Sequence, residues 1–445
     1  MSEKMRAQGF EHRTADSSGS WTYAETVARG HYHRNQGGLF GKYDNVRTYW
    51  EDELTRFVLR PFVREKIAAC AAANRGLRIL DLGCGSGEGY ELLTKIRQND
   101  LSLEELQRYV VTPEQIGLYL GVDLNSSMVQ QGRENYGEAK NVRFAQADLR
   151  EKLGEAERER PFDIYFSSYG SLSHLSSRAL NTCLSAVARH AEPGALVVLD
   201  LMGRFSPEWP DYWQAREESE KVRPYSMSYL FPEQERRSTD IAQFPLRFWT
   251  GQEVRTLCAE VSEQTGVVVE PVEMFDRSLF VGRHVDTGEY GTCLPPLRSL
   301  VNGLYEQNVR TNFERFVVTY RPVAGAHVQN AFFSRLSACW NTAVEFARVR
   351  LSGARVDLVE MPGWREFPAP LQLSLMTIDR VIDSVAWIDY SDVRANIIEP
   401  QIAYVLRGMQ YHMQEGLGCG HGLVALLRIA GAASEAEARQ RPAHR

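Results

Sequence analysis

The stretch that decides the fold is residues 77–89, which read LRILDLGCGSGEG. Residues 77–82 form a short, mostly apolar run, as expected of a strand buried in a parallel sheet. Gly83, Gly85 and Gly87 then alternate with small residues, so the backbone can turn sharply and a ligand can approach the main chain. A helix is predicted from Glu88 onward. A strand, a glycine turn and a helix N-terminus together predict a ligand cradle at the carboxyl edge of a parallel sheet.

The glycine spacing does not fit the dinucleotide-binding fingerprint, which requires a third glycine three residues after the second. In the two possible registers that position is Glu88 or Tyr90. A carboxylate at this turn repels a pyrophosphate but suits a cationic ligand that carries an amino group. The stretch resembles the first motif of the class I S-adenosylmethionine-dependent methyltransferases, Asp/Glu-x-Gly-x-Gly-x-Gly, with Asp81 as its acidic residue. An ordinary glycine-rich turn is the alternative interpretation.

Size and composition set limits on the class of protein. With 445 residues, the chain is long enough for two domains, and its net charge of −6 argues against a broad nucleic-acid-binding face. No apolar run approaches the roughly 18 residues of a membrane span, and residues 1–8 lack a signal-peptide core. The 7 cysteines contain no Cys-x-x-Cys pair, which favours reduced thiols. We therefore expect a cytoplasmic enzyme with neither a nucleic acid nor a membrane as its partner.

Two further strands are predicted to end at the same edge of the sheet. The strand at 119–125 carries Asp123, whose carboxylate suits the two hydroxyl groups of a ribose, although a helix-capping role is the alternative. Residues 142–149 resemble the adenine-contacting motif of the family. The resemblance implies that S-adenosylmethionine is the cofactor and S-adenosylhomocysteine the product. The cofactor-binding residues that it implies are Asp81, Gly83, Cys84, Gly85, Gly87, Asp123, Leu124, Asp148, Leu149 and Ser167.

The acceptor side of the site is predicted from residues 161–175, which are expected to form the fourth strand and the loop that follows it. Its sequence SYGSLSHL resembles the corresponding loop of glycine and sarcosine N-methyltransferases, and it supplies Tyr169 and His174 as candidate catalytic residues. For His174, a catalytic base and a structural hydrogen-bonding role both stay open. Residues 1–50 are predicted to form an arm that closes as a lid, or that only packs on the sheet. The candidate substrate-binding residues are Tyr43, Tyr169, His174, Arg283 and His284.

The domain organisation follows from the order of these motifs. The sequence predicts a doubly wound α/β sheet of seven strands, Rossmann-like, over residues 51–322, with insertions at about 98–116, 202–248 and 286–312. The sixth strand is expected at 267–275 and the seventh, antiparallel strand at 313–320. Three apolar stripes at helical spacing then predict a C-terminal helical extension over residues 323–445. We expect this extension to pack on the first domain and to contribute to a homodimer.

The tail also contains a small group of metal-type side chains, His412, Cys419 and His421. Glycines surround them and a zinc site usually has four ligands, so a turn is favoured and no metal is predicted. The sequence thus predicts methyl transfer to oxygen, nitrogen or carbon of a small-molecule acceptor such as a secondary metabolite. Two alternatives stay open. One is a non-methylating protein on the same fold, cyclase-like or using the cofactor structurally, and the other is a protein-modifying methyltransferase that docks through its helical tail.

Overall fold

The computed structural model describes residues 26–28, 30, 42–98, 108–236, 241, 243–385, 387–388 and 391–432. Most of the predicted lid lies outside these residues, and so do residues 99–107 of the insertion predicted at about 98–116. The strands are β1 (Leu77–Leu82), β2 (Ile116–Asp123), β3 (Val142–Gln146), β4 (Ile164–Phe166), β5 (Leu196–Gly203), β6 (Val222–Ser226), β7 (Gln243–Trp249), β8 (Val267–Arg277) and β9 (Gly422–Ala432). The α-helices are α3 (Glu53–Ala72), α4 (Glu88–Thr94), α5 (Ser126–Tyr136), α6 (Ser177–His190), α7 (Glu233–Arg236), α8 (Gly251–Thr265), α9 (Leu297–Gly303), α10 (His327–Leu351), α11 (Ala369–Val385) and α12 (Glu399–Met413).

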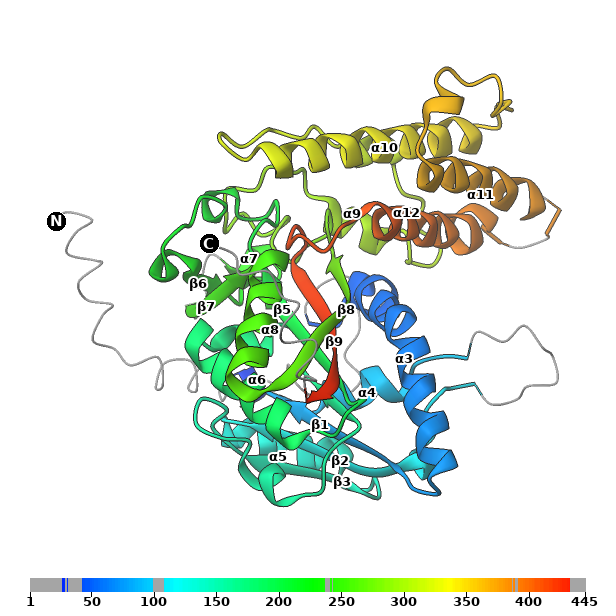
Figure 1. Ribbon diagram of the computed structural model, residues 1–445. Coiled ribbons are helices and arrows are strands. Elements are labelled where there is room, and N and C mark those ends of the chain that lie inside the picture. Colours follow the sequence, from blue (N-terminus) through cyan, green and yellow to red (C-terminus); the bar gives the residue numbers. More distant parts are fainter. Residues whose placement is uncertain are drawn as a thin grey trace.

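The central sheet has helices on both faces, as the sequence predicts. Strands β3, β2, β1, β4 and β5 pair in parallel in this order, and β9 pairs antiparallel with both β5 and β8. One face of the sheet shares a core with α6 and α8, and the other shares a core with α3, α4 and α5. The doubly wound α/β fold is therefore confirmed (Figure 1).

The prediction of the seventh strand at 313–320 is wrong. Phe313–Phe316 forms a single 3-10 turn whose two phenylalanines are buried. Side chains of α10 satisfy the backbone that follows: Trp340 Nε1 donates to the Phe316 carbonyl at 2.8 Å, and Asn341 bonds both the amide and the carbonyl of Val318 at 2.7 and 2.9 Å. With its polar groups paired to a helix, this segment has no need of a strand partner.

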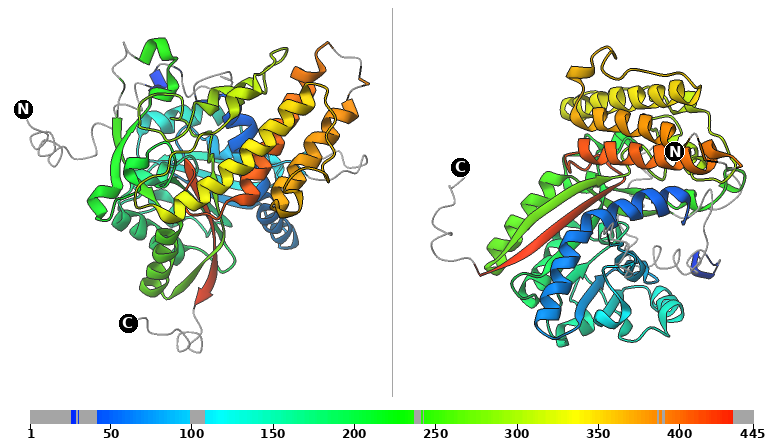
Figure 2. Two further views of the ribbon diagram at one scale, coloured as in Figure 1. Left: turned by 90° about the horizontal axis from the view of Figure 1, so that it is seen from above. Right: turned by 90° about the vertical axis from the view of Figure 1, so that its right-hand side faces the viewer.

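The place of the seventh strand is taken by β9, at the far end of the described chain. Its register with β5 runs from Leu196 opposite Arg428 to Met202 opposite Gly422. Residues 423–427 are completely buried because both faces of this strand lie under helices. The sheet is therefore incomplete at residue 322, and the helical region is an insertion between β8 and β9 rather than an extension (Figures 1 and 2).

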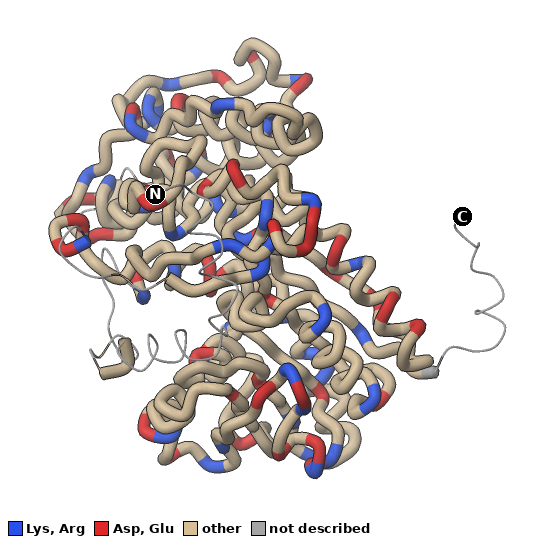
Figure 3. The backbone as a smooth tube through the Cα atoms, turned by 90° about the vertical axis from the view of Figure 1, so that its left-hand side faces the viewer, with Lys and Arg blue, Asp and Glu red and all other residues tan. Residues whose placement is uncertain are grey.

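Helices α10, α11 and α12 lie together on one side of the sheet, as Figure 2 shows. Their apolar stripes are buried, as predicted, and they share one core with α9 and with the segment around Trp50. Lysine and arginine are interspersed with aspartate and glutamate along the chain (Figure 3). Among the described residues, no helix has the length and apolar character needed to cross a membrane.

The first prediction concerns the last strand. Leu426→Ala should lower the free energy of unfolding by about 2–5 kcal/mol, because Leu426 is fully buried in the core that the sheet shares with α3, α4 and α5, and its truncation leaves a cavity. Denaturant unfolding followed by circular dichroism measures this difference. Leu373→Ala is the matched control, because Leu373 on α11 is 59% exposed and should change stability by less than about 0.5 kcal/mol. Equal effects of the two substitutions would contradict the burial of β9.

Candidate active site

The glycine turn after β1 is fixed to the end of β2. The amides of Gly83 and Cys84 both donate to the Val122 carbonyl, at 2.9 and 3.0 Å. Gly83 and Gly87 have φ angles of +70° and +95°, which favour glycine, and a Cβ at Gly87 would lie 2.7 Å from the Tyr136 ring. The turn is therefore an open backbone cradle at the carboxyl edge of the sheet, as predicted.

A cavity begins at this cradle and extends along the ends of β2, β4 and β5. On the cradle side, Asp123 receives hydrogen bonds from the amides of Gly85 (2.9 Å) and Asn125 (2.8 Å). Burial raises the pKa of the Asp123 carboxyl. Asn125 in turn caps α5 by accepting from the amides of Ser127 and Met128. The Asp123 carboxylate is thus held in place at the cavity wall by main-chain donors.

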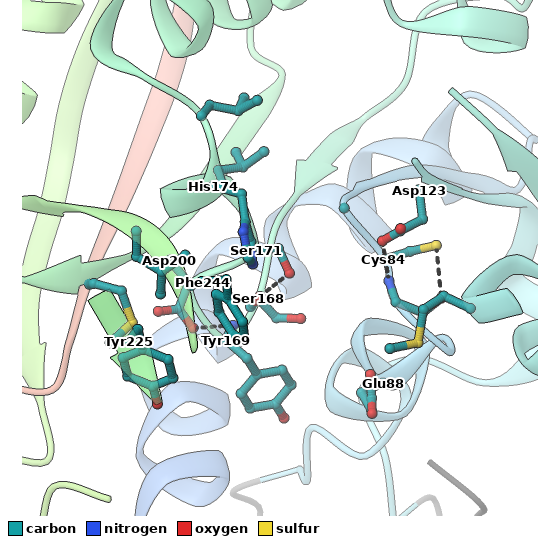
Figure 4. Close-up of a pocket in the computed structure, with 18 of the residues that line it drawn as sticks. Cys84, Glu88, Asp123, Ser168, Tyr169, Ser171, His174, Asp200, Tyr225 and Phe244 are labelled. Atoms are coloured by element: carbon teal, nitrogen blue, oxygen red, sulfur yellow. Dashed lines mark hydrogen bonds between the residues drawn. The ribbon is translucent and has the colours of Figure 1, made fainter. Parts of the chain in front are cut away.

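Most of the predicted cofactor-binding residues line this cavity. They are Gly83, Cys84, Gly85, Asp123, Leu124, Asp148 and Leu149. Asp148 is paired with Arg150, whose Nε lies 2.9 Å from Oδ1, and hydrogen bonding from Arg150 lowers the pKa of Asp148. Figure 4 shows Asp123, Cys84 and Glu88 on one side of the cavity and His174, Tyr225 and Phe244 toward the other.

Five predicted residues are not among those that line the cavity: Asp81, Gly87, Ser167, Tyr43 and His284. Asp81 is fully buried inside the sheet, where it accepts a hydrogen bond from Tyr119, and burial raises the pKa of its carboxyl to about 7. A Cβ at Gly89 would lie 2.1 Å from its Oδ2 atom, so Gly89 leaves room for this carboxyl. The Asp81 side chain therefore lies beneath the cradle and does not line the cavity.

The loop after β4 separates the two sides of the cavity. Tyr169 adopts a φ of +56°, a strained conformation for a residue other than glycine, and its amide donates to Asp200 at 2.6 Å. Its hydroxyl donates to Asp52 at 2.8 Å, and burial raises the pKa of Tyr169 above its usual value. Tyr169 is consequently a hydrogen-bond donor here and is not poised to act as a base.

His174 follows on the same loop and also lines the cavity. Its ring lies 5.0 Å from that of Phe244, which belongs to the β6–β7 hairpin. Although the residue keeps accessible surface, the protein packed around it lowers the pKa of its imidazole to about 4. The imidazole is therefore neutral at physiological pH, and it faces the part of the cavity that the hairpin encloses.

The short segment before α3 supplies groups that the sequence analysis missed. Arg47, in the π-helical turn Val46–Asp52, is 1% exposed and lines the cavity, and its guanidinium lies 3.8 Å from the centre of the Tyr169 ring. Among the described residues, its Nε and Nη2 atoms have no hydrogen-bond partner, although Nε lies 3.7 Å from Asp52 in an ion pair. Lys42 lines the cavity beside Glu88 and pairs with it. The only signal in the sequence was the concentration of polar residues among aromatic ones in this segment.

Buried ion pairs attach this segment to the distant insertion at 286–312. Arg298 pairs with Asp44 at 2.7 Å and with Glu51 at 2.8 Å, and Arg283 lies 3.4 Å from Glu51. Arg283 lines the cavity, as predicted for a substrate-binding residue. Asp44 and Glu51 thus hold the segment around Arg47 beside the cavity through charge pairs that no local sequence pattern signals.

The far wall of the cavity is aromatic. Its members come from the β6–β7 hairpin, within the insertion that was predicted at 202–248: Tyr225, Met227, Tyr229, Phe244, Pro245 and Leu246. His421, which immediately precedes β9, completes this wall. The sequence analysis treated His421 only as a metal-type residue, and the described residues contain no group of side chains suited to hold a metal ion.

A second prediction follows from the buried Asp81. Since its pKa is about 7 in the folded protein and near 3.8 when unfolded, the native state binds more protons than the unfolded chain between these values. Stability should therefore fall as the pH rises through this window, by about 2–4 kcal/mol for this group. Asp81→Asn should lose that pH dependence. In denaturant titrations between about pH 5 and pH 8, its free energy of unfolding should rise relative to that of the wild type.

The control for this comparison is Asp211→Asn, since Asp211 is exposed. Its stability should follow the wild type across the same pH range. An Asp81→Asn variant that also follows the wild type would show that Asp81 is ionised in the folded protein.

Comparison with known proteins agrees with the geometry of the cradle. Residues 79–194 match the family model described as a methyltransferase domain. No curated protein matches the chain. Among solved structures, the CcbJ methyltransferase of Streptomyces caelestis is 16% identical, with 57% of this chain and 89% of that chain covered and a TM-score of 0.34.

Two other solved structures are similar over less of the chain. The S-adenosylmethionine-bound amino pentose methyltransferase CalS10 of Micromonospora echinaspora is 18% identical, over 47% of this chain and 83% of that one, with a TM-score of 0.28. The YcgJ protein of Bacillus subtilis is 16% identical, over 45% of this chain and 66% of that one, also with a TM-score of 0.28. Scores this low add nothing about the acceptor.

The family match begins in β1, includes the glycine cradle and Asp123, and ends just before β5. It therefore covers the half of the sheet whose strand ends form the cradle side of the cavity. Residues 79–194 therefore carry a methyltransferase domain on a Rossmann-like fold.

Proposed function

We propose that this protein transfers a methyl group from S-adenosylmethionine to a small-molecule acceptor. The observation that carries the proposal is one continuous cavity with two chemically different sides. The glycine cradle and Asp123 line one side, and the hairpin residues Tyr225, Tyr229 and Phe244 line the other. An enclosed aromatic wall beside a cofactor cradle suits a small, flat acceptor better than a protein surface.

The residues of the cradle side fit the cofactor group by group. Asp123 can accept from the two ribose hydroxyls, and Asp148 can accept from the adenine amino group. Although Arg47 Nε lies 3.7 Å from Asp52, neither Nε nor Nη2 donates a hydrogen bond to the described residues, so this buried guanidinium suits the carboxylate of the methionine part. When bound, S-adenosylmethionine supplies a methyl group already activated by its positively charged sulfur.

Because the methyl group is activated, the chief task of this chain is to align the acceptor with it. The Tyr169 loop is rigid for this purpose: its amide is bonded to Asp200 and its hydroxyl to Asp52, on two different elements. Arg277 holds Asp200 in turn, with Nη1 2.9 Å from Oδ2. We assign to Tyr169 and His174 the contact with the acceptor, and to Arg283 a contact at the edge of the same space.

The test is the affinity for S-adenosylhomocysteine, measured by isothermal titration calorimetry. Asp123→Ala should weaken binding by about 1–3 kcal/mol, the scale of losing hydrogen bonds to a charged group. Asp123→Asn keeps the size of the side chain and should weaken binding in the same direction, because the amide accepts fewer hydrogen bonds than the carboxylate.

Asp211→Ala is the control, since this exposed residue does not line the cavity. It should bind S-adenosylhomocysteine as the wild type does. If both Asp123 variants also retain full affinity, the cofactor does not use this carboxylate and the proposed arrangement fails.

A further inference from the structure

His421 occupies a fixed position at the carboxyl end of the sheet. Its carbonyl accepts from the Gly203 amide at 3.1 Å, and its own amide donates to the Ser278 carbonyl at 3.3 Å. The preceding turn is anchored by Asp276, which accepts from the amides of Leu417 and Gly418, both at 2.9 Å. The side chain is 5% exposed and lines the cavity on its acceptor side.

A buried carboxylate determines which nitrogen of His421 carries the proton. Glu208 is completely buried, and its Oε2 lies 2.7 Å from His421 Nδ1. The same carboxylate also accepts from the Ser206 hydroxyl at 2.9 Å and from the backbone amide of His284. We assign the hydrogen of the neutral ring to Nδ1, because its carboxylate partner accepts hydrogen bonds from its other neighbours, and this leaves the lone pair on Nε2.

The Nε2 atom is directed to the aromatic part of the cavity. It lies 3.4 Å from the hydroxyl of Tyr225, which itself lines the cavity. Tyr225 and Phe244 pack against each other with their ring centres 5.7 Å apart, and Tyr229 lies 6.4 Å from Tyr225. These rings offer flat apolar faces to a planar molecule, while the imidazole offers it a proton acceptor.

We propose that His421, positioned by Glu208, is the general base for a planar acceptor that bears a hydroxyl group, a phenol in the simplest case. The inference rests on the proposed function and names its substrate class. The acceptor O–H bond breaks, its proton forms a bond to His421 Nε2, and the electron pair stays on the oxygen that is to be methylated. The Glu208 carboxylate stabilises the imidazolium that results.

His174 is the other histidine of the cavity, and it suits this task less well. Burial lowers the pKa of His174 to about 4, so its imidazole is a weak base. The Glu208 carboxylate both orients the His421 ring and offsets the charge that proton transfer creates. We therefore assign the role of general base to His421 and a contact with the acceptor to His174.

The protonation of a bound phenol reports on this base directly. The probe is 4-nitrophenol, whose phenolate absorbs visible light whereas the neutral phenol does not. In full-length protein saturated with S-adenosylhomocysteine, and at a pH below the pKa of the free phenol, the bound probe should be largely phenolate. His421→Gln should lower the bound phenolate fraction at least tenfold, and Glu208→Gln should lower it in the same direction.

The apparent pKa of the bound probe, taken from a pH titration, separates a base from a merely structural residue. Several other titratable or charged groups surround His421 and are common to all variants: Glu51, Asp200, Tyr225, Arg277 and His284. His412→Ala is the matched control, since His412 is exposed on α12 and lies outside the cavity. It should leave the titration unchanged, and circular dichroism should show that every variant is folded.

Three results would overturn the proposal: a bound probe that stays neutral in the wild type, no binding of the probe at all, or a phenolate signal that disappears in His174→Ala but survives in His421→Gln. Calorimetry with S-adenosylhomocysteine on the same samples tests the proposed function separately. If the protein ionises the phenol but does not bind S-adenosylhomocysteine, the assignment of His421 as a base stands and the methyltransferase proposal is refuted.

Discussion

The structure depends on the antiparallel insertion of β9 between β5 and β8. Residues 423–427 of this strand are completely buried, and their apolar side chains join the cores on both faces of the sheet. Burial of this kind contributes roughly 1.5–3 kcal/mol per large side chain, so the last strand is a major source of stability. Because β9 pairs with both β5 and β8, the chain between β8 and β9 leaves the sheet and then returns to it.

That constraint links the helical region to the active site. Helices α10, α11 and α12 lie between β8 and β9 in the chain, and they share a core with the segment around Trp50. The same segment places Arg47 in the wall of the cavity. The return of the chain then places His421 at the carboxyl end of β5, where the Gly203 amide binds its carbonyl. The cavity is therefore assembled from segments near both ends of the chain and from the hairpin, in addition to the consecutive strands that form the cradle.

Features that depend on local sequence were predictable. The glycine turn forms where the sequence predicted it, and Asn125 and the Thr250–Glu253 pair cap α5 and α8 through residue types that favour helix starts. Each arises from contacts within a few residues, and backbone geometry decides them. The position of Asp123 at the end of β2 was predictable for the same reason, since parallel strands bring their carboxyl ends to one edge.

Features that depend on distant partners were not predictable. The segments 313–320 and 423–429 are both short and rich in apolar residues, and their partners decide which one becomes a strand. Side chains of α10 bond the backbone of the first segment. Strands β5 and β8 bond the backbone of the second. Likewise, Glu208 and His421 are 213 positions apart, and no local pattern announces their contact. Asp81 fits the sequence motif, but its side chain points into the sheet toward Tyr119.

The central claim is that the cofactor and the acceptor meet at the Tyr169 loop, between the cradle and the aromatic wall. A crystal structure of the full chain with bound S-adenosylhomocysteine tests it most directly. The claim predicts the ribose hydroxyls on Asp123 and the sulfur atom facing Tyr225, Phe244 and His421 across the loop. A ligand whose adenine occupies the aromatic wall, or whose sulfur points away from it, would contradict the claim.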